Sequence, residues 1–325
     1  MAEITLVQAV TQALAYEMEQ DQDVVVMGED VGLNGGVFRA TDGLFQRFGD
    51  KRVLDTPLAE AMIAGLAVGM ATQGMKPVAE FQFMGFIYPG FDQIINHAAR
   101  LRNRTRGRLS CPLVYRAPFG GGIHAPEHHS ESTEALFAHM PGVRVVIPSS
   151  PARAYGLLLA SIRNPDPVIF LEPKRIYRLV KQNVPDNGEA LPLDKAFVLR
   201  EGTDVTLISW GASMNETLQA AQKLATQNVS AEVIDLATIK PIDAETILNS
   251  VAKTGRAVII HEAAKTCAVG AEVAAIIAEE GLMSLMAPIA RVTGYDTLMP
   301  YYKLEKKYIP SVARIIDGVK KVMEY

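Results

Sequence analysis

A single carboxylate interrupts an apolar stretch in the first third of the chain. Glu60 is the only charged side chain in Leu58–Ala71 (LAEAMIAGLAVGMA), a run that follows Thr56-Pro57. A carboxylate in apolar surroundings is costly unless donors satisfy it, and burial raises its pKa. Such a group can act as a catalytic acid or base near neutral pH. On this run alone, the plainer reading is favoured: a glutamate stabilised by the dipole of a first helical turn.

The same stretch predicts a helix with Thr56 as N-cap and Pro57 as its first residue. Its length and residue types are typical of a buried helix. Ala61, Gly65 and Gly69 recur at four-residue spacing, so one small-residue face would let another helix come close. We therefore expect a buried, closely packed helix that carries its one carboxyl group in the first turn.

A second cluster of reactive side chains follows Gly120–Gly122. The segment His124–Ser130 (HAPEHHS) holds three of the six histidines. Its H-x-x-E-H spacing matches a zinc-peptidase pattern, which requires both histidines on one face of a regular helix. Pro126 disrupts a helix interior, so we expect His124 to lie outside any helix. The spacing is therefore poor support for a peptidase.

The favoured reading of this cluster is an active-site loop that leads into a helix. Ser130 or Ser132 is predicted to cap a helix over Thr133–Met140, with Glu134 in its first turn. A histidine just before a helix N-terminus tends to stay neutral and can donate to an anionic substrate. Three histidines beside a glycine triplet favour this function over an ordinary surface loop.

The chain contains no recognisable phosphate-binding motif. Gly120–Gly122 lacks the lysine and spacing of a P-loop, and no G-x-G-x-x-G begins a helix. The Gly-Asp-Gly and paired asparagines of a magnesium-diphosphate clamp do not occur, and Asp42-Gly43 does not match them. The sequence alone therefore gives little support for a nucleotide site.

Composition excludes several classes of protein. The 325 residues are 49% hydrophobic with a net charge of -4, which is enough chain for two α/β domains and argues against non-specific nucleic-acid binding. The arginines at every second position of Ala99–Arg108 would spread around a helix axis instead of forming one basic stripe, so they give little support for nucleic-acid binding. Cys111 and Cys267 offer neither a disulfide framework nor zinc spacing. Without a signal peptide or a membrane-length apolar run, we expect a cytoplasmic protein with no membrane partner.

Short apolar runs alternate with helical patterns along the chain. The predicted strands are Val24–Met27, Pro77–Phe83, Leu113–Arg116, Val143–Ile147, Val168–Leu171, Val205–Ser209, Ala231–Ile234, Ala257–His261 and Ile289–Val292. Continuous apolar strands separated by helices, such as the one near Asn215–Gln227, indicate parallel sheets covered on both faces.

The Pro- and Gly-rich segment Lys181–Leu193 predicts a domain boundary. We divide the chain into a domain at 1–185, a linker at 186–203 and a domain at 204–325. Ligands of parallel sheets bind beyond the carboxyl ends of the strands. The segments at those ends include Gly28-Glu29-Asp30 and the aromatic segment Gln82–Phe86.

Taken in order, these features resemble the β subunit of the thiamine-diphosphate-dependent 2-oxo acid dehydrogenases, the decarboxylating component of the pyruvate and branched-chain multienzyme complexes. The resemblance runs from end to end. The matching segments are Gly28-Glu29-Asp30-Val31, Gly35–Arg39, Asp55–Glu60, Ala79–Phe83, Phe91–Ile94, His129-Ser130, Pro148-Ser149, Phe170–Lys174 and Val292–Thr297. This ordered set of motifs outweighs the plainer reading of Glu60.

The resemblance implies an α/β fold of two parallel-sheet sandwich domains. A thiamine-diphosphate pyrimidine-binding domain would be followed by a transketolase C-terminal-like domain. It also implies an α2β2 heterotetramer that shares thiamine diphosphate between subunits and docks onto a dihydrolipoyl acyltransferase core. The α subunit would hold the diphosphate and Mg²⁺, in agreement with the missing clamp in this chain.

The resemblance also implies site residues. Glu60 matches the carboxyl that hydrogen-bonds a ring nitrogen of the cofactor's aminopyrimidine and favours its imino tautomer, which then removes the thiazolium proton. Phe86 matches the aromatic that packs against the pyrimidine, and Glu29 lies where the family has a carboxylate near the cofactor. His129 matches the histidine that orients the 2-oxo acid or the incoming lipoyl group.

Two further matches concern an ion and a docking contact. A potassium-binding turn of some relatives corresponds to Leu113, Ser161, Ile162, Asn164 and Asp166; Asn164 and Asp166 stand where relatives carry Asp and Asn. Met286 stands where many relatives have a glutamate that meets the acyltransferase's binding domain.

The resemblance leaves two substrates to choose between. Phe83–Phe86 and His124–Ser130 look like pyruvate-type β subunits, whereas Gly36–Arg39 and Gly294–Thr297 are shared with branched-chain enzymes. We predict pyruvate, with a branched-chain 2-oxo acid as the alternative. An alternative of another class is a non-catalytic subunit that only docks onto the acyltransferase core.

Overall fold

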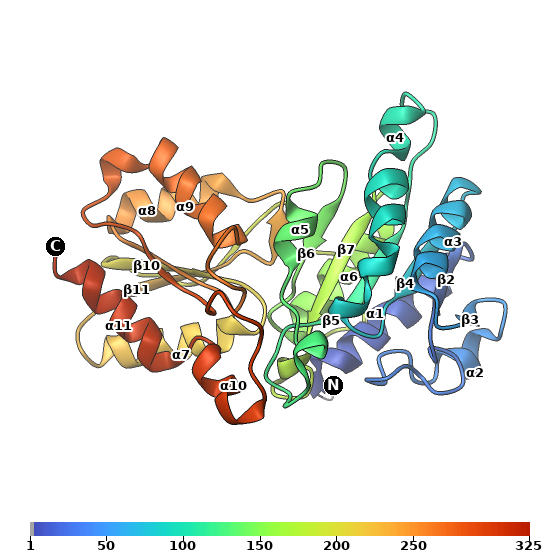
Figure 1. Cartoon of the computed structure of the whole chain (residues 1–325), viewed down its shortest axis with the longest axis horizontal. Coiled ribbons are helices and arrows are strands. Elements are labelled where there is room, and N and C mark those ends of the chain that lie inside the picture. Colours follow the sequence, from blue (N-terminus) through green and yellow to red (C-terminus); the bar gives the residue numbers. More distant parts are fainter. Residues whose placement is uncertain (1–2) are drawn as a thin grey trace. The chain divides into compact units, whose positions relative to one another are not determined.

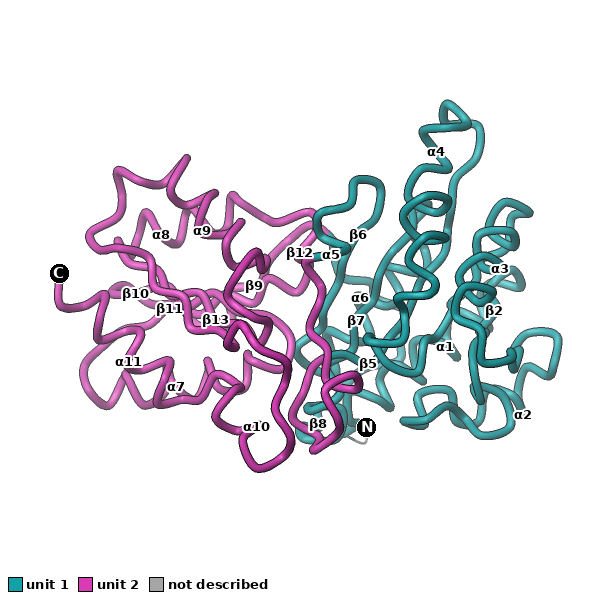
Figure 2. The backbone as a smooth tube through the Cα atoms, in the orientation of Figure 1, with its two compact units in different colours: residues 1–119, 136–193 teal, residues 120–135, 194–325 magenta. Residues whose placement is uncertain are grey.

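The computed structural model describes residues 3–325, which form two compact units (Figure 2). Of these residues, the first unit comprises 3–119 and 136–193, and the second comprises 120–135 and 194–325. The segment with the three clustered histidines thus belongs to the second unit. Local sequence patterns do not indicate this membership. Our sequence-based division at 185 and 204 stays a prediction.

The first unit is built on a parallel sheet with the order β6-β7-β5-β4-β2-β3. Its strands are β2 (Val24–Gly28), β3 (Val53–Asp55), β4 (Lys76–Glu80), β5 (Val114–Phe119), β6 (Arg144–Val146) and β7 (Val168–Pro173). Every residue of β2, β5 and β7 is buried, as expected for strands covered on both faces. A short antiparallel pair joins β1 (Glu3–Thr5) to β8 (Lys181–Asn183).

Helices cover this sheet. The helices that contact its strands are α1 (Leu6–Gln20), α2 (Leu44–Phe48), α3 (Glu60–Thr72) and α6 (Pro151–Arg163). Two short helices, α4 (Leu101–Arg104) and α5 (Glu134–Ala138), lie in the connections between strands. Single turns form η1 (Met84–Phe86), η2 (Tyr88–Gly90), a π-helical η3 (Gln93–Ala98) and η5 (Lys174–Ile176). The helix α1 packs on α6, whereas α3 packs on β4, η2 and η3. The turns η1 and η2 therefore connect the end of β4 to the side of α3.

The second unit contains a five-stranded sheet with the order β14-β13-β10-β11-β9. Its strands are β9 (Phe197–Arg200), β10 (Val205–Ser209), β11 (Ala231–Asp235), β13 (Ala257–Ile260) and β14 (Ala290–Val292). All pairs are parallel except β11 with β9. A short strand, β12 (Thr238–Lys240), follows β11 along the chain.

Helices pack on both faces of this sheet (Figure 1). α7 (Ser213–Ala225) and α11 (Val312–Met323) cover one face, and α8 (Ala244–Thr254) and α9 (Val269–Glu280) cover the other. The remaining elements are η4 (Glu127–His129), η6 (Leu282–Ser284) and α10 (Tyr302–Tyr308). A continuous core of buried aliphatic side chains joins β10, β11 and β13 to α7 and α11. Both units thus have the predicted α/β class.

Two sequence predictions about the helix at Glu60 are wrong. α3 begins at Glu60 after Ala59, so Thr56 and Pro57 lie outside it. The helix is also only half-buried: it buries Ile63, Ala64, Ala67 and Ala71 along one stripe, while Leu58, just before the helix, and Met62 and Leu66 on it are exposed. The run is apolar all round, and that pattern cannot show which side meets the sheet.

Only part of the predicted small-residue face, Ala61, Gly65 and Gly69, packs closely against a neighbour. A Cβ added to Gly65 would lie 3.2 Å from the Gln93 side-chain oxygen, so η3 does come close at this position. Ala61 and Gly69 are exposed, and a Cβ at Gly69 would meet nothing within 4 Å. Of the three small residues, only Gly65 therefore lies against a close neighbour.

Within residues 3–325, no helix is both long and apolar enough to cross a lipid bilayer. The two cysteines are free, with Cys111 buried and Cys267 exposed.

Candidate active site

Two carboxyl groups come together at one edge of the first sheet. Glu29 directly follows β2 and is only 7% exposed, whereas Glu60 is the half-buried first residue of α3. Burial raises the pKa of Glu29, and the nearby charges of Glu60 and Asp30 raise it further. The charge of Glu60 thus acts on the Glu29 carboxyl, although the two residues lie 31 positions apart (60 − 29) in the sequence.

The loop after β2 is held so that Glu29 points inward. Asp30 has a positive φ of 57°, and its carbonyl oxygen accepts a hydrogen bond from the Gly36 amide at 2.8 Å. The Gly32 amide donates to the Asp55 carboxylate at 2.6 Å, which ties the loop to the end of β3. Asp55 belongs to the segment that resembles the family, but the sequence did not indicate this role.

The first turn of α3 packs closely against Gly90. Any larger residue at this position would require the neighbouring atoms to move. A Cβ at Gly90 would lie 3.0 Å from the Glu60 carbonyl oxygen and 3.1 Å from the Ala64 side chain. The turn η2 therefore leans directly on the backbone that carries the Glu60 carboxyl. At the N-terminus of a helix, that carboxylate also experiences the positive end of the dipole.

Aromatic rings line the segment just before η2. Phe86 is half-buried in η1, and its ring packs edge-on against Phe83 with 5.3 Å between centroids. Phe83 in turn contacts Phe38 at 5.4 Å, and the Lys174 ammonium lies 5.8 Å from the Phe83 ring centre. Phe86 therefore has a rigid support and a partly open ring, which suits stacking on a flat heterocycle.

The histidine segment belongs to the second unit. His129 ends the short 3-10 turn η4, which starts after Pro126, and the His129 amide donates to the Pro126 carbonyl at 3.0 Å. His124 has a φ of 63° and lies outside any helix, so that prediction is confirmed. In the described part of the chain, no group of three or more His, Cys, Asp or Glu side chains could hold a metal ion. The peptidase geometry is therefore not formed.

The predicted capping of the next helix is wrong. The Ser130 hydroxyl donates to the Pro126 carbonyl at 3.1 Å, and the Ser132 hydroxyl donates to the Glu262 carboxylate at 2.7 Å. The helix α5 begins only at Glu134. The two serines instead stabilise the loop, because carbonyl and carboxylate acceptors compete with the amides of a first turn.

Glu29, Glu60 and Phe86 thus all belong to the first unit, whereas His129 lies on a loop of the second. The residues that match the potassium-binding turn lie together around the end of α6. The Ser161 carbonyl accepts from the Asn164 amide, and the Asn164 side chain accepts from the Asp166 amide at 2.9 Å. The Asp166 carboxylate pairs with Arg102 at 2.6 Å. The ion site stays a prediction.

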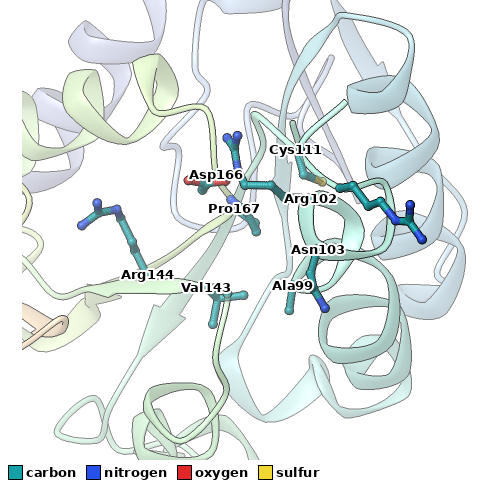
Figure 3. Close-up of a pocket in the computed structure, with 12 residues that line it drawn as sticks. Ala99, Arg102, Asn103, Cys111, Val143, Arg144, Asp166 and Pro167 are labelled. Carbon is teal, nitrogen blue, oxygen red and sulfur yellow. Dashed lines mark hydrogen bonds and ion pairs between the residues drawn. The ribbon is translucent and has the colours of Figure 1, made fainter. Parts of the chain in front are cut away.

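Asp166 also lies in the wall of a cavity of about 750 Å³ that Figure 3 shows. Arg102, Arg144 and Cys111 line the same cavity. Glu29, Glu60 and Phe86 do not line it, so its size does not identify the candidate active site.

A second unusual carboxyl lies beside the histidine loop. Glu134 is 1% exposed, and the Trp210 indole N–H donates to it at 3.3 Å. Burial raises the pKa of Glu134 to about 8, and the charge of Glu262 contributes in the same direction. Glu134 is therefore protonated at neutral pH in the folded chain.

Substituting Glu134 with glutamine is expected to change how stability depends on pH. Between an unfolded pKa of about 4.5 and a folded pKa of about 8, the folded chain binds one more proton than the unfolded chain. The free energy of unfolding should therefore fall as pH rises through this window. Glu134→Gln removes that loss, so it should raise the unfolding temperature relative to wild type more at pH 8 than at pH 5. Equal differences at both pH values, or the same effect in an exposed control, Glu279→Gln, would contradict this assignment.

Two family models match the chain. Residues 2–180 match the transketolase pyrimidine-binding domain, and residues 194–315 match the transketolase C-terminal domain. Among solved structures, the chain is similar to one described as "Split gene transketolase, inactive beta4 tetramer", with a TM-score of 0.82, 24% identity and 99% coverage of both chains. At 24% sequence identity, this structural similarity shows that the two chains share a fold and nothing more.

Curated relatives match over the whole chain. The protein named "Pyruvate dehydrogenase E1 component subunit beta" of Staphylococcus epidermidis is 49% identical over 325 residues, with 100% coverage of both chains. The protein of the same name from Bacillus subtilis is 47% identical over the same length, and that of Acholeplasma laidlawii is 49% identical over 322 residues. Together with the two domain matches, these identities show that the chain belongs to the family of pyruvate dehydrogenase E1 component β subunits.

Proposed function

We propose that this chain is the β subunit of a pyruvate-decarboxylating enzyme and binds the pyrimidine end of thiamine diphosphate. The observation that carries the proposal is the pair of neighbouring carboxyl groups, Glu29 and Glu60, at the end of β2 and the start of α3. The name of the curated relatives supports the choice of reaction.

The residues of the first unit fit an aminopyrimidine. Glu60 offers a half-buried carboxyl on a fixed helical turn, and Phe86 offers an aromatic ring on the adjacent turn. Burial, and after it the charge of Glu60, raises the pKa of the neighbouring Glu29 carboxyl. A carboxyl that can carry a proton near neutral pH suits hydrogen bonding to a basic ring nitrogen.

Each residue then has a defined task. Glu60 would hold the aminopyrimidine through a hydrogen bond between its carboxyl group and a ring nitrogen. Phe86 would pack against the ring, and Glu29 would place a second carboxyl group beside it. His129 donates to the carboxylate of the 2-oxo acid or to the incoming lipoyl group. When bound, thiamine diphosphate supplies the electron sink for decarboxylation.

The chain requires an α subunit in this proposal. The sequence contains no magnesium-diphosphate clamp, and the described residues form no acidic or histidine cluster for a metal. The exposed apolar side chains Leu58, Met62 and Leu66 near Glu60 support a protein interface at this helix. We propose an α2β2 assembly that docks onto a dihydrolipoyl acyltransferase core and works in the cytoplasm.

Reconstitution with the α subunit tests the function and the substrate. We expect thiamine-diphosphate- and Mg²⁺-dependent turnover of pyruvate that exceeds turnover of 2-oxoisovalerate, because the loop segments resemble pyruvate-type subunits. Steady-state kcat/KM values for the two acids, measured with the acyltransferase as acceptor, decide the question. A higher value for 2-oxoisovalerate would assign the chain to the branched-chain enzymes, and no turnover of either acid would contradict the proposed function.

A further inference from the structure

The histidine loop is held by two buried carboxylates of its own unit. Glu262 follows β13, and Glu305 lies in α10. They are 5% and 1% exposed, and both face the backbone of residues 120–132, which we name the histidine loop. Neither carboxylate is used by the proposed chemistry, so each requires another explanation.

Glu305 accepts two hydrogen bonds from the loop backbone and pairs with one side chain of the loop. The amides of Gly122 and His124 donate to its Oε1 atom at 2.7 and 3.3 Å, and His124 Nδ1 lies 3.0 Å from its Oε2 atom. A carboxylate at 1% exposure is costly without such donors. Conversely, loss of this carboxylate would leave the loop amides without an acceptor. The contact is therefore a strong constraint on the backbone of the loop.

Glu262 holds the two ends of the loop. The Gly121 amide donates to its Oε1 atom at 2.9 Å, and the Ser132 hydroxyl donates to the same atom at 2.7 Å. Inside the loop, the Gly120 amide donates to the Glu131 carbonyl at 3.0 Å. The loop is thus closed at its base and anchored to β13.

This arrangement explains the glycine triplet. A Cβ at Gly120 would lie 2.1 Å from the Glu262 carboxylate, and a Cβ at Gly121 would lie 2.4 Å from the Met299 methyl group. Gly120 and Gly122 also have φ values of +81° and +90°, which other residues rarely adopt. The glycines therefore allow the loop backbone to come close to buried carboxylates. A glycine-rich phosphate-binding loop looks similar in sequence, but here the neighbouring group is a carboxylate of the protein itself.

The loop also contains a strained residue at the carboxylate. His124 has a φ of +63°, a conformation that few non-glycine residues adopt. Glu305 contacts both the amide and the side chain of His124. Glu305 thus contacts His124 through two different groups at the point where the chain turns toward His129.

We propose that Glu305 and Glu262 are positioning residues that set the conformation of the histidine loop and thereby the presentation of His129 to the substrate. The inference rests on the proposed function for the role of His129. The effect of the two carboxylates on the loop itself is independent of that function. The experiment therefore needs one readout for the loop and one for turnover.

Hydrogen–deuterium exchange of the reconstituted enzyme provides the first readout. In Glu305→Ala, peptides that cover residues 120–132 should exchange at least about tenfold faster, because Gly122 and His124 lose their acceptor. Glu305→Gln should exchange at the wild-type rate within about threefold, because its side-chain oxygen can still accept from both amides. Glu280→Ala, at an exposed glutamate of the same unit, is the control. Unchanged exchange in Glu305→Ala would overturn the proposal.

Turnover provides the second readout. Glu305→Ala should lower kcat by ~10–100-fold, since displacement of a substrate-orienting group by about 1 Å has effects of this size. Glu305→Gln should retain most of the activity. In a His129→Ala background, Glu305→Ala should cost no more than about twofold. A full additional loss in that background would overturn the link to His129. If His129→Ala alone had wild-type kcat, the proposed role of His129 would fail, while the exchange data would still decide whether Glu305 holds the loop.

Discussion

Glu60→Gln is expected to lower the turnover of the reconstituted enzyme by ~10²–10⁴-fold, the usual contribution of a general acid–base group. The substitution keeps the size of the side chain on the first turn of α3 but removes the acidic proton. Cofactor activation would then lack the group that stabilises the imino tautomer. The measurement is kcat with pyruvate, α subunit and acyltransferase at saturating thiamine diphosphate.

The matched control is Glu189→Gln, at an exposed glutamate of the first unit. It should retain wild-type turnover. Size-exclusion chromatography should show that Glu60→Gln still assembles with the α subunit. An assembled Glu60→Gln enzyme with undiminished turnover would contradict the catalytic assignment and favour a subunit that only docks onto the acyltransferase core.

Arg116→Met is expected to reduce the free energy of unfolding by about 3–5 kcal/mol, the cost of breaking a buried ion pair by removing one partner. Arg116 is 0% exposed in the middle of the first sheet. Its guanidinium donates to Glu172 at 2.5 and 2.9 Å and to Glu80 at 2.7 Å, and the Tyr177 hydroxyl also donates to Glu172 at 2.6 Å. The variant would leave two carboxylates buried without their counter-ion. Chemical denaturation of the full chain measures the loss.

Two variants make this prediction specific. Arg178→Met removes an exposed arginine of the same unit and should change the free energy of unfolding by less than about 0.5 kcal/mol. The triple variant Arg116→Met, Glu80→Gln, Glu172→Gln should regain part of the stability, because no unpaired charge remains buried. A loss below about 1 kcal/mol in Arg116→Met, or no recovery in the triple variant, would contradict the account of this network.

The central strands were predictable because their apolar runs are continuous. β2, β7, β10, β11 and β13 begin at the predicted residues, and each is almost wholly buried. The strands that sequence reasoning missed are β1, β3, β8, β9 and β12. Each has only three or four residues, so neither alternation nor a long apolar run can develop. Their pairing depends on neighbours that are distant in sequence.

The candidate site was predictable in part, through motifs rather than periodicity. Glu29, Glu60, Phe86 and His129 were named from the resemblance, and their roles stay proposals. The start of α3 was missed because Thr56-Pro57 has the pattern of a helix start, although the helix begins three residues after Pro57 (60 − 57). The pattern is a statistical preference, and the packing of η2 against the first turn decides the actual boundary.

The anchoring of the histidine loop could not be predicted from local sequence. Glu305 lies 181 positions after His124, in a short helix with no motif of its own. The glycine triplet was a signal for close backbone approach, but the sequence could not show whether a phosphate or a carboxylate comes close. Only the fold brings the two segments together.

The most direct test of the central claim is the exchange rate of the thiazolium C2 proton of thiamine diphosphate in the reconstituted enzyme. Our account predicts that Glu60→Gln slows this exchange by at least ~10²-fold, because the proton-accepting imino group depends on the Glu60 carboxyl. Exchange in Glu305→Ala should match the wild type, since that residue acts on the histidine loop. Wild-type exchange in Glu60→Gln, with the cofactor bound, would contradict the assignment of Glu60 as the residue that activates the cofactor.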